Sequence, residues 1–121
     1  MTTRRLPPCP RRPNCVSSQA TDSSQRVPPL PCLESCERTL KRLATILRST
    51  PGVRIVENSP PYLRAEFTTA IFRFVDDLEL LADSQRGVID VRSASRVGTW
   101  DLGTNRRRVE SLRQRLLQGR D

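Results

Sequence analysis

Apolar residues between Leu33 and Leu47 recur with the spacing of one face of an α-helix, and charged residues occupy the opposite face. The apolar positions are Leu33, Cys36, Leu40, Leu43, Ala44 and Leu47. Pro51 and Gly52 follow directly, and this pair is a helix stop signal. The pattern therefore predicts an amphipathic helix that begins near Leu33 and ends before Pro51.

The chain after this helix has the patterns of four β-strands. The predicted strands are 53–58, 62–69, 74–83 and 88–96. In the second of them Leu63, Ala65 and Phe67 point to one face, and polar residues alternate with them. One apolar and one solvated face is the pattern of strands in an antiparallel sheet.

The turn at 84–87 joins the last two strands as a four-residue hairpin loop, and this loop length fixes how the strands pair. The register places Glu79 opposite Arg92 on the outer face, where the opposite charges attract, and Leu80 opposite Val91 on the inner face. A slip by one residue would mix the two faces, so we predict this register.

The last part of the chain predicts a second helix. After the loop 97–104, Thr104 or Asn105 is placed to cap the helix and Gly119 to end it. Its apolar positions are Val109, Leu112 and Leu116. The order helix, four strands, helix predicts a two-layer α+β domain, in which a four-stranded antiparallel sheet carries both helices on one face.

Residues 1–31 contain seven prolines and almost no apolar periodicity. Such a segment buries too little apolar surface to fold by itself. We expect it to be a tail or an extended strap that lies on the domain. We expect residues 32–121 to form a single α+β domain, which is long enough for a core of its own.

The net charge of +8 is concentrated at the two ends of the chain. Residues 1–31 contain five Arg and one Asp, a net of +4, and residues 104–121 contain six Arg and two acids, again +4. Residues 32–103 contain ten basic and ten acidic residues. Arginine suits bidentate contacts with phosphate or carboxylate, although an excess of arginine and proline also fits a GC-rich coding sequence. Binding of nucleic acid or an anionic surface is therefore expected only through the tail or the Arg-rich last helix.

The four cysteines occur without any histidine, so only thiolates could bind a metal. Neither the Cys9–Cys15 nor the Cys32–Cys36 spacing matches a zinc knuckle, and we predict no metal site and no cofactor. Cys36 falls on the apolar face of the first helix, as a small buried hydrophobe does. Cys9 and Cys15 have two interpretations, a disulfide in an oxidising compartment or a reactive thiol near arginines.

Localisation signals are absent from the sequence. No apolar run approaches the roughly 18 residues of a membrane-spanning helix. The positively charged start is not followed by the apolar run of a secretory signal. We therefore expect a cytoplasmic protein.

Three segments together resemble a known family. They are CPRRPNCVSSQA at 9–20, FRFVDDLEL at 72–80 and RSASRVGTWDLGTNRRR at 92–108. In this order and spacing they are similar to the domain-of-unknown-function family 1499 (DUF1499), known from bacteria, cyanobacteria and chloroplasts and without an established activity. The resemblance implies that the chain is the whole domain and that its proline-rich start belongs to it, which favours a strap. Thr104 and the pair Cys32 and Cys36 depart from the family pattern.

The third of these segments, together with Asp76, supplies the candidate site. The polar candidates are Asp76, Arg92, Ser93, Ser95, Arg96, Asp101, Asn105, Arg106 and Arg107. One interpretation is an anion pocket to which backbone N–H groups at the start of the last helix contribute. The other, which we favour, is a structural network in which Arg96 and Arg107 pair with Asp76 and Asp101. The reason is that Asp76 falls on the inner face, opposite Ser95, where an unpaired carboxylate is costly.

The chain has few residues that could serve catalysis. It has no histidine, and its only lysine, Lys41, lies on the charged face of the first helix. Ser93 and Ser95 therefore lack a neighbouring general base. Asp76 and Asp77 are adjacent on a strand and point to opposite faces, so they cannot act as a carboxylate pair. An enzymatic role is therefore less favoured than a binding role.

These observations favour a small non-catalytic binding or assembly module in which the Arg/Asp/Asn cluster braces the fold. A small anionic-ligand or enzymatic site at the same cluster is the first alternative. Nucleic-acid or anionic-surface binding through the last helix is the second. Because the strands lack paired surface aromatics at the spacing of RNA-binding motifs, a protein partner or a small anion is favoured over nucleic acid.

Overall fold

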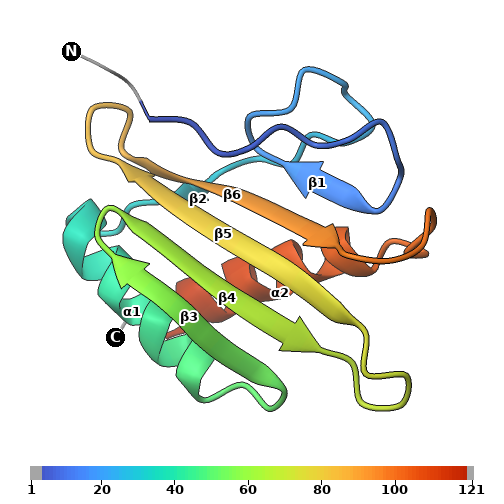
Figure 1. Cartoon of the computed structure of the whole chain (residues 1–121). Helices are drawn as coiled ribbons and strands as arrows, with labels where there is room; N and C mark the ends of the chain where they lie inside the picture. Colours follow the sequence, from blue (N-terminus) through green and yellow to red (C-terminus); the bar gives the residue numbers. More distant parts are fainter. Residues whose placement is uncertain (1–3, 120–121) are drawn as a thin grey trace.

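Two layers make up the computed structural model, which describes residues 4–119 (Figure 1). One layer is an antiparallel sheet of six strands, and the other is a pair of helices that cover the same face of the sheet. The elements are β1 (Cys15–Ser17), β2 (Leu30–Pro31), α1 (Cys36–Arg48), β3 (Val53–Ser59), β4 (Tyr62–Thr68), β5 (Val75–Asp83), β6 (Val88–Ser95) and α2 (Thr104–Gln118). The predicted α+β class is confirmed.

The sheet has six strands and not the predicted four, so the predicted order of helix, four strands, helix is wrong in detail. The four predicted strands are present as β3 to β6 and lie side by side in chain order. The two additional strands, β1 and β2, belong to the N-terminal segment and both pair with β6. They have three and two residues, which is too short for an alternating pattern to reveal them in the sequence.

The predicted register between β5 and β6 is confirmed, since Glu79 pairs with Arg92 and Leu80 with Val91. This register directs the apolar side chains of the sheet towards the two helices. The largest fully buried residues include Leu43, Leu47, Leu63, Leu78, Leu80, Ile89, Val91, Val109 and Leu116. The same register places Asp76 opposite Ser95. The carboxylate of Asp76 therefore lies on the inner face, where the apolar residues of β5 end.

Helix α1 begins at Cys36, later than the predicted start near Leu33. Ser35 is the N-cap, because its backbone is extended and its hydroxyl accepts a hydrogen bond from the N–H of Arg38 at 3.1 Å. Leu33 still packs against the core, so its place in the apolar pattern reflects burial rather than helical structure. Within residues 4–119, neither helix is long and apolar enough to span a bilayer.

The N-terminal segment lies along β6 as a strap (Figure 1). It pairs with one end of β6 through β1 and with the other end through β2. Val27 and Leu30 are buried in the main core, whereas Leu6 packs on the outer face of the sheet. Without this strap, β6 would expose a row of unpaired backbone donors and acceptors. The strap therefore completes the sheet.

Two disulfide bonds, Cys9–Cys15 and Cys32–Cys36, pair all four cysteines. The first is one of the two interpretations given by the sequence. The second corrects the interpretation of Cys36, which is buried as expected but is bonded to Cys32. The Cys9–Cys15 bond closes a loop at the start of β1, and the Cys32–Cys36 bond joins the end of the strap to the first turn of α1.

Loss of the Cys9–Cys15 bond is expected to lower the stability of the fold. We expect the double variant Cys9→Ser/Cys15→Ser to lose about 2 kcal/mol of unfolding free energy, because a short cross-linked loop restricts the unfolded chain by roughly this amount. Urea denaturation of the variant and the parent measures the difference. The matched variant Cys32→Ser/Cys36→Ser removes a loop of similar length and should cost a similar amount. A Cys9/Cys15 variant as stable as the parent would contradict this expectation.

Candidate functional site: the polar cluster and the loop end of the sheet

Two loops leave the sheet at the same end. Loop 69–74 joins β4 to β5, and loop 96–103 joins β6 to α2. They lie side by side because β5 and β6 are antiparallel neighbours, and the N–H of Arg96 donates to the carbonyl of Val75 at 3.2 Å. We call these two loops the loop end of the sheet (Figure 1, right).

Asn105, in the first turn of α2, is the centre of a buried network beneath the loop end. Its side chain is fully buried. The Oδ1 atom accepts hydrogen bonds from Ser93 Oγ at 2.6 Å and Arg108 Nη1 at 2.8 Å. The Nδ2 group donates to Ser95 Oγ at 2.9 Å, Asp101 Oδ2 at 2.7 Å and the carbonyl oxygen of Asn14 at 3.1 Å. One side chain therefore joins α2 to β6, to the strap and to the loop before the helix.

Asp76 is the buried carboxylate of this network, with 3% of its surface exposed. Its partner is Arg108, whose Nη2 lies 2.8 Å from Asp76 Oδ2. The guanidinium of Arg108 also lies over the ring of Phe67, 4.5 Å from its centroid. The requirement that Asp76 be paired was predicted correctly, but the predicted partner was wrong.

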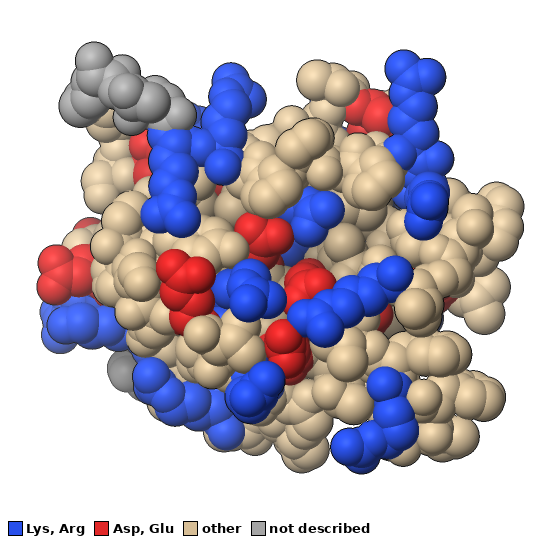
Figure 2. Space-filling model, viewed as in Figure 1, with Lys and Arg blue, Asp and Glu red and all other residues tan. Residues whose placement is uncertain are grey.

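The predicted partner, Arg96, lies on the outer face of the sheet. It contacts Asp77 at 2.8 Å and Glu66 at 2.7 Å, and Arg64 contacts Asp77 at 3.2 Å. Figure 2 shows acidic and basic side chains alternating over the middle of this face. The hydrogen bond from Arg96 lowers the pKa of Asp77 below its usual value. Asp76 and Asp77 thus face opposite sides of the sheet, as the strand geometry predicts.

Asp101 caps α2 in place of the predicted Thr104 or Asn105. Gly103 occupies the N-cap position with a φ of 79° and has no side chain to offer. The carboxylate of Asp101 reaches over it and accepts from the N–H of Gly103 at 2.8 Å and the N–H of Asn105 at 3.1 Å. Burial alone would raise the pKa of Asp101, but the hydrogen bonds from Asn105 and Gly103 outweigh it and lower the pKa below its usual value.

The remaining predicted arginines lie outside this network. Arg92 is on the outer face and contacts Glu79 at 3.2 Å, and Glu79 also accepts a hydrogen bond from the hydroxyl of Tyr62 at 2.8 Å. Arg106 donates to two carbonyl oxygens of the strap, the nearer at 2.8 Å. Arg107 donates to the carbonyl of Leu102 at 2.8 Å and is exposed. The network of Asp76, Arg96, Asp101 and Arg107 predicted from the sequence is therefore not formed, because Arg108 and Asn105 take the places of the two arginines.

Two members of the network were missed in the sequence. Arg108 follows Asn105 by three positions, the helical spacing that puts two side chains on one face, and this signal was available. Asn14 lies in the strap, and its carbonyl accepts from Ser95 N at 3.0 Å. Its side chain donates to the carbonyl of Gly98. Asn14 thus fixes the loop 96–103 from a segment distant in sequence, which no local pattern indicates.

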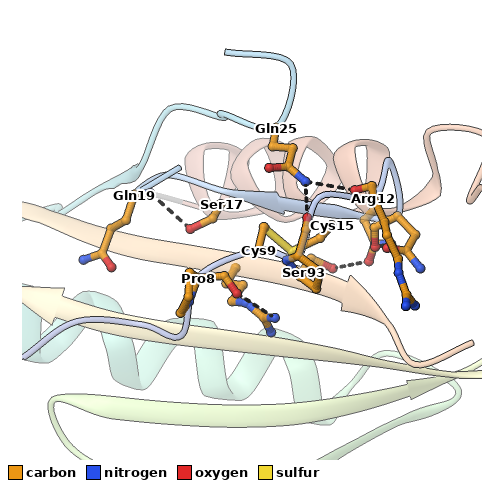
Figure 3. Close-up of a disulfide and its surroundings, with 12 residues drawn as sticks. Pro8, Cys9, Arg12, Cys15, Ser17, Gln19, Gln25 and Ser93 are labelled. Atoms are coloured by element: carbon orange, nitrogen blue, oxygen red, sulfur yellow. Dashed lines mark hydrogen bonds between the residues drawn. A yellow bond between two sulfur atoms is a disulfide. The ribbon is translucent and has the colours of Figure 1, made fainter. Parts of the chain in front are cut away.

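Asn14 belongs to the short loop that the Cys9–Cys15 disulfide closes, and Figure 3 shows this disulfide beside Arg12 and Gln25. Gln25 adds two hydrogen bonds, which its side-chain amide donates to the carbonyls of Pro10 at 2.7 Å and Arg12 at 2.9 Å. Cys9 and Cys15 are among the residues that line a groove of about 980 Å³ between the strap and the loop 96–103, together with Arg11, Arg12 and Trp100. Because Cys9 and Cys15 are bonded, neither is a free thiol, and their contact with the site is structural.

The loop end exposes large hydrophobic side chains. They are Ile71, Phe72, Phe74, Val97, Trp100 and Leu102, with 84%, 72%, 49%, 52%, 76% and 86% of their surfaces exposed. The rings of Phe72 and Phe74 stack with centroids 5.5 Å apart. Among the described residues, Leu117 on α2 is the only other large hydrophobic side chain that is exposed. The same end of the molecule therefore has polar side chains that are hydrogen-bonded beneath the loops and large apolar side chains that are exposed on the loops.

The lowered pKa of Asp101 predicts how acid affects stability. A carboxylate whose folded-state pKa is below its unfolded value stabilises the fold above that unfolded value, near pH 4, and loses this contribution as the pH falls through the folded pKa. At neutral pH, Asp101→Asn should lower the unfolding free energy by about 1 kcal/mol, as the loss of other helix caps does. When the pH is then lowered, the unfolding free energy of the variant should fall by less than that of the parent. Urea denaturation across this pH range tests it, and parallel pH profiles for parent and variant would disprove it.

Comparison with known proteins identifies a family. The family model described as a protein of unknown function, DUF1499, matches residues 5–116, which include the strap, the loop end and the polar cluster. No curated protein and no solved structure matches the chain. The family match confirms the resemblance of the three sequence segments, and this chain belongs to the DUF1499 family of proteins of unknown function.

Proposed function

We propose that this protein is a non-catalytic binding module in which the polar cluster braces the fold and the loop end contacts a partner. The observation that carries the proposal is the contrast between the two parts of one site. The polar groups of the buried network bond to one another, whereas the loops that they support expose six large hydrophobic side chains. The first is the arrangement of a structural brace, and the second is that of a contact surface.

The polar contacts give less support to an anionic-ligand or enzymatic site at the same cluster. An anion site needs donors that converge on free space, but the donors of Asn105 and Arg108 are engaged within the network. Among the described residues, Arg92 Nε is the one buried side-chain nitrogen or oxygen without a partner, and it lies on the outer face. Within the cluster, Asp76 is paired with Arg108 and Asp101 accepts from the N–H groups of Gly103 and Asn105, so neither carboxylate is free to act as a base.

The contacts of α2 also give less support to nucleic-acid binding through this helix. Its arginines donate hydrogen bonds to other parts of the chain, namely Arg106 to the strap, Arg107 to Leu102, Arg108 to Asp76 and Asn105, Arg113 to Pro28 and Pro29, and Arg115 to Thr50. Nucleic-acid binding requires arginines that are free to reach phosphates. In α2 the guanidinium groups instead tie the helix to the strap, the sheet and α1.

We further propose that the protein works in an oxidising compartment, contrary to the cytoplasmic location expected from the sequence. Both pairs of cysteines are bonded, and structural disulfides persist where thiols are not kept reduced. Protein isolated from its natural source without reductant should therefore contain no thiol that reacts with an alkylating agent after denaturation. Reaction at all four cysteines would contradict this location.

Stability measurements distinguish a brace from a ligand site. If the cluster is a brace, Asp76→Ala and Arg108→Ala should each lower the unfolding free energy by about 2–4 kcal/mol, because each strands a buried partner charge. The double variant should cost less than the sum of the two, since the residues are in contact. Arg54→Ala, which breaks an exposed ion pair on the outer face, is the control and should cost less than about 1 kcal/mol.

Substitutions in the loop end, unlike those in the cluster, should leave the unfolding free energy unchanged. Phe72→Ser and Leu102→Ser remove side chains that are mostly exposed, so urea denaturation should find them as stable as the parent. Cluster variants with unchanged or raised stability would contradict the bracing role and favour a ligand site, because residues of functional sites are commonly kept at a cost in stability.

A further inference from the structure

We propose that the loop end docks on an anionic phospholipid bilayer, an inference that rests on the proposed role of the loop end as the contact surface. Four properties of the two loops carry it. These are the exposed apolar side chains, the unusual backbone conformation at Arg73 and Leu102, the free arginines nearby, and the rigid attachment of the loops to the sheet.

The apolar side chains of the loop end are largely exposed on two separate loops, and on one of these Phe72 and Phe74 stack on each other. Phe72, Trp100 and Leu102 each expose more than two thirds of their surface and come from two separate loops. A bilayer interface accommodates separate side chains without a matching pocket for each, whereas a protein partner needs shape complementarity around each of them. Trp and Phe are also residue types that membrane interfaces favour.

The backbone supports this orientation at a cost to the fold. Leu102 and Arg73 have φ angles of 54° and 60°, in the left-handed region that residues other than glycine rarely adopt. Leu102 is 86% exposed, so burial of its side chain does not compensate for the unfavourable backbone. Residues held in sparsely populated backbone conformations cluster at functional sites. These two residues lie on the two loops of the loop end, one on each, and a third non-glycine residue with a positive φ, Glu34, lies just before α1.

The charges beside the apolar side chains favour an anionic surface. Arg73 lies between Phe72 and Phe74 in the sequence, and Arg11 and Arg12 line the same groove as Trp100. Within residues 4–119, the side chains of these three arginines form no hydrogen bond or ion pair. Of the acidic residues at the loops and the groove, Asp101 points inwards and caps α2, and Asp22 accepts hydrogen bonds from Ser24. Free guanidinium groups beside protruding aromatic side chains match lipid phosphates above acyl chains.

The loops are attached firmly enough for the side chains to be in place before docking. Loop 96–103 is fixed by Asn14 through Gly98 and by the cap that Asp101 forms. Loop 69–74 is closed by two hydrogen bonds between Thr69 and Phe74. The backbone N–H of Thr69 donates to the carbonyl of Phe74 at 2.8 Å, and the N–H of Phe74 donates to Thr69 Oγ1 at 2.9 Å. Docking therefore requires little ordering of the backbone.

Trp100 provides a direct test, because it is the only tryptophan of the chain and lies on the proposed docking surface. The full chain is titrated with vesicles of phosphatidylcholine alone and with vesicles that also contain phosphatidylglycerol. We expect a blue shift of the Trp100 emission with the anionic vesicles, quenching by brominated acyl chains, and weaker binding at high salt. No shift, or an equal affinity for both vesicle types, would overturn the proposal.

Matched variants separate the apolar and charged contributions. Phe72→Ser/Leu102→Ser should weaken vesicle binding by roughly tenfold or more, since each side chain would be withdrawn from the interface, while Leu117→Ser on α2 should have no effect. Arg12→Gln/Arg73→Gln should remove the preference for anionic lipid, and Arg48→Gln on α1 should not. Equal binding by parent and loop variants would overturn the proposal.

The vesicle test can fail while the proposed function stands. If the cluster variants lose stability as expected but Trp100 responds to no vesicle, the loop end contacts a protein and the lipid inference is wrong. If the cluster variants keep their stability, the bracing role itself fails, whatever the vesicles show. Circular dichroism of each loop variant establishes that it is folded, so that a loss of binding is assigned to the altered surface.

Discussion

The need to neutralise one buried carboxylate, Asp76, organises the loop end of this protein. The strand register puts Asp76 on the inner face of β5, where leaving it unpaired would cost several kcal/mol. Its partner Arg108 comes from α2, so the helix must begin close to the end of the sheet. Asn105 then lies one turn before Arg108 and joins the same network. The pair therefore ties the first turns of α2 to the inner face of β5, next to the contact with Asn14.

The second constraint is that the backbone donors and acceptors along the edge of β6 need partners, and the strap provides them. β1 and β2 pair with the two ends of β6, and the segment before and between them is held by the Cys9–Cys15 bond and by Gln25. The two constraints meet at Asn14, which is next to Cys15 and bonds to both Ser95 and Asn105. The proline-rich start is therefore part of the fold, because it completes the sheet and also contributes to the polar network.

The sequence predicts well what depends on faces and loop lengths, and poorly what depends on the rotation of one element against another. The β5–β6 register follows from a four-residue hairpin loop, and with it the need to pair Asp76. Which arginine meets Asp76 depends on how α2 is turned, and that is set by Gly103 and by the cap from Asp101. Neither was visible in the pattern. The strands β1 and β2 were missed because two or three residues among prolines carry no alternation, and they form only because β6 offers them a partner.

The many arginines serve structure and charge at the same time. Arg42 and Arg106 donate to backbone carbonyls of other elements, where the planar guanidinium bridges groups that a shorter side chain would not reach. A carbonyl oxygen satisfies such a donor but does not neutralise its charge. Arg42 and Arg106 therefore keep their charge although they are hydrogen-bonded, in contrast to the ion pairs on the outer face of the sheet. Arg106 lines the groove beside Trp100 together with Arg11 and Arg12, and in the proposed docking the charge of these three arginines would attract an anionic surface towards the loop end.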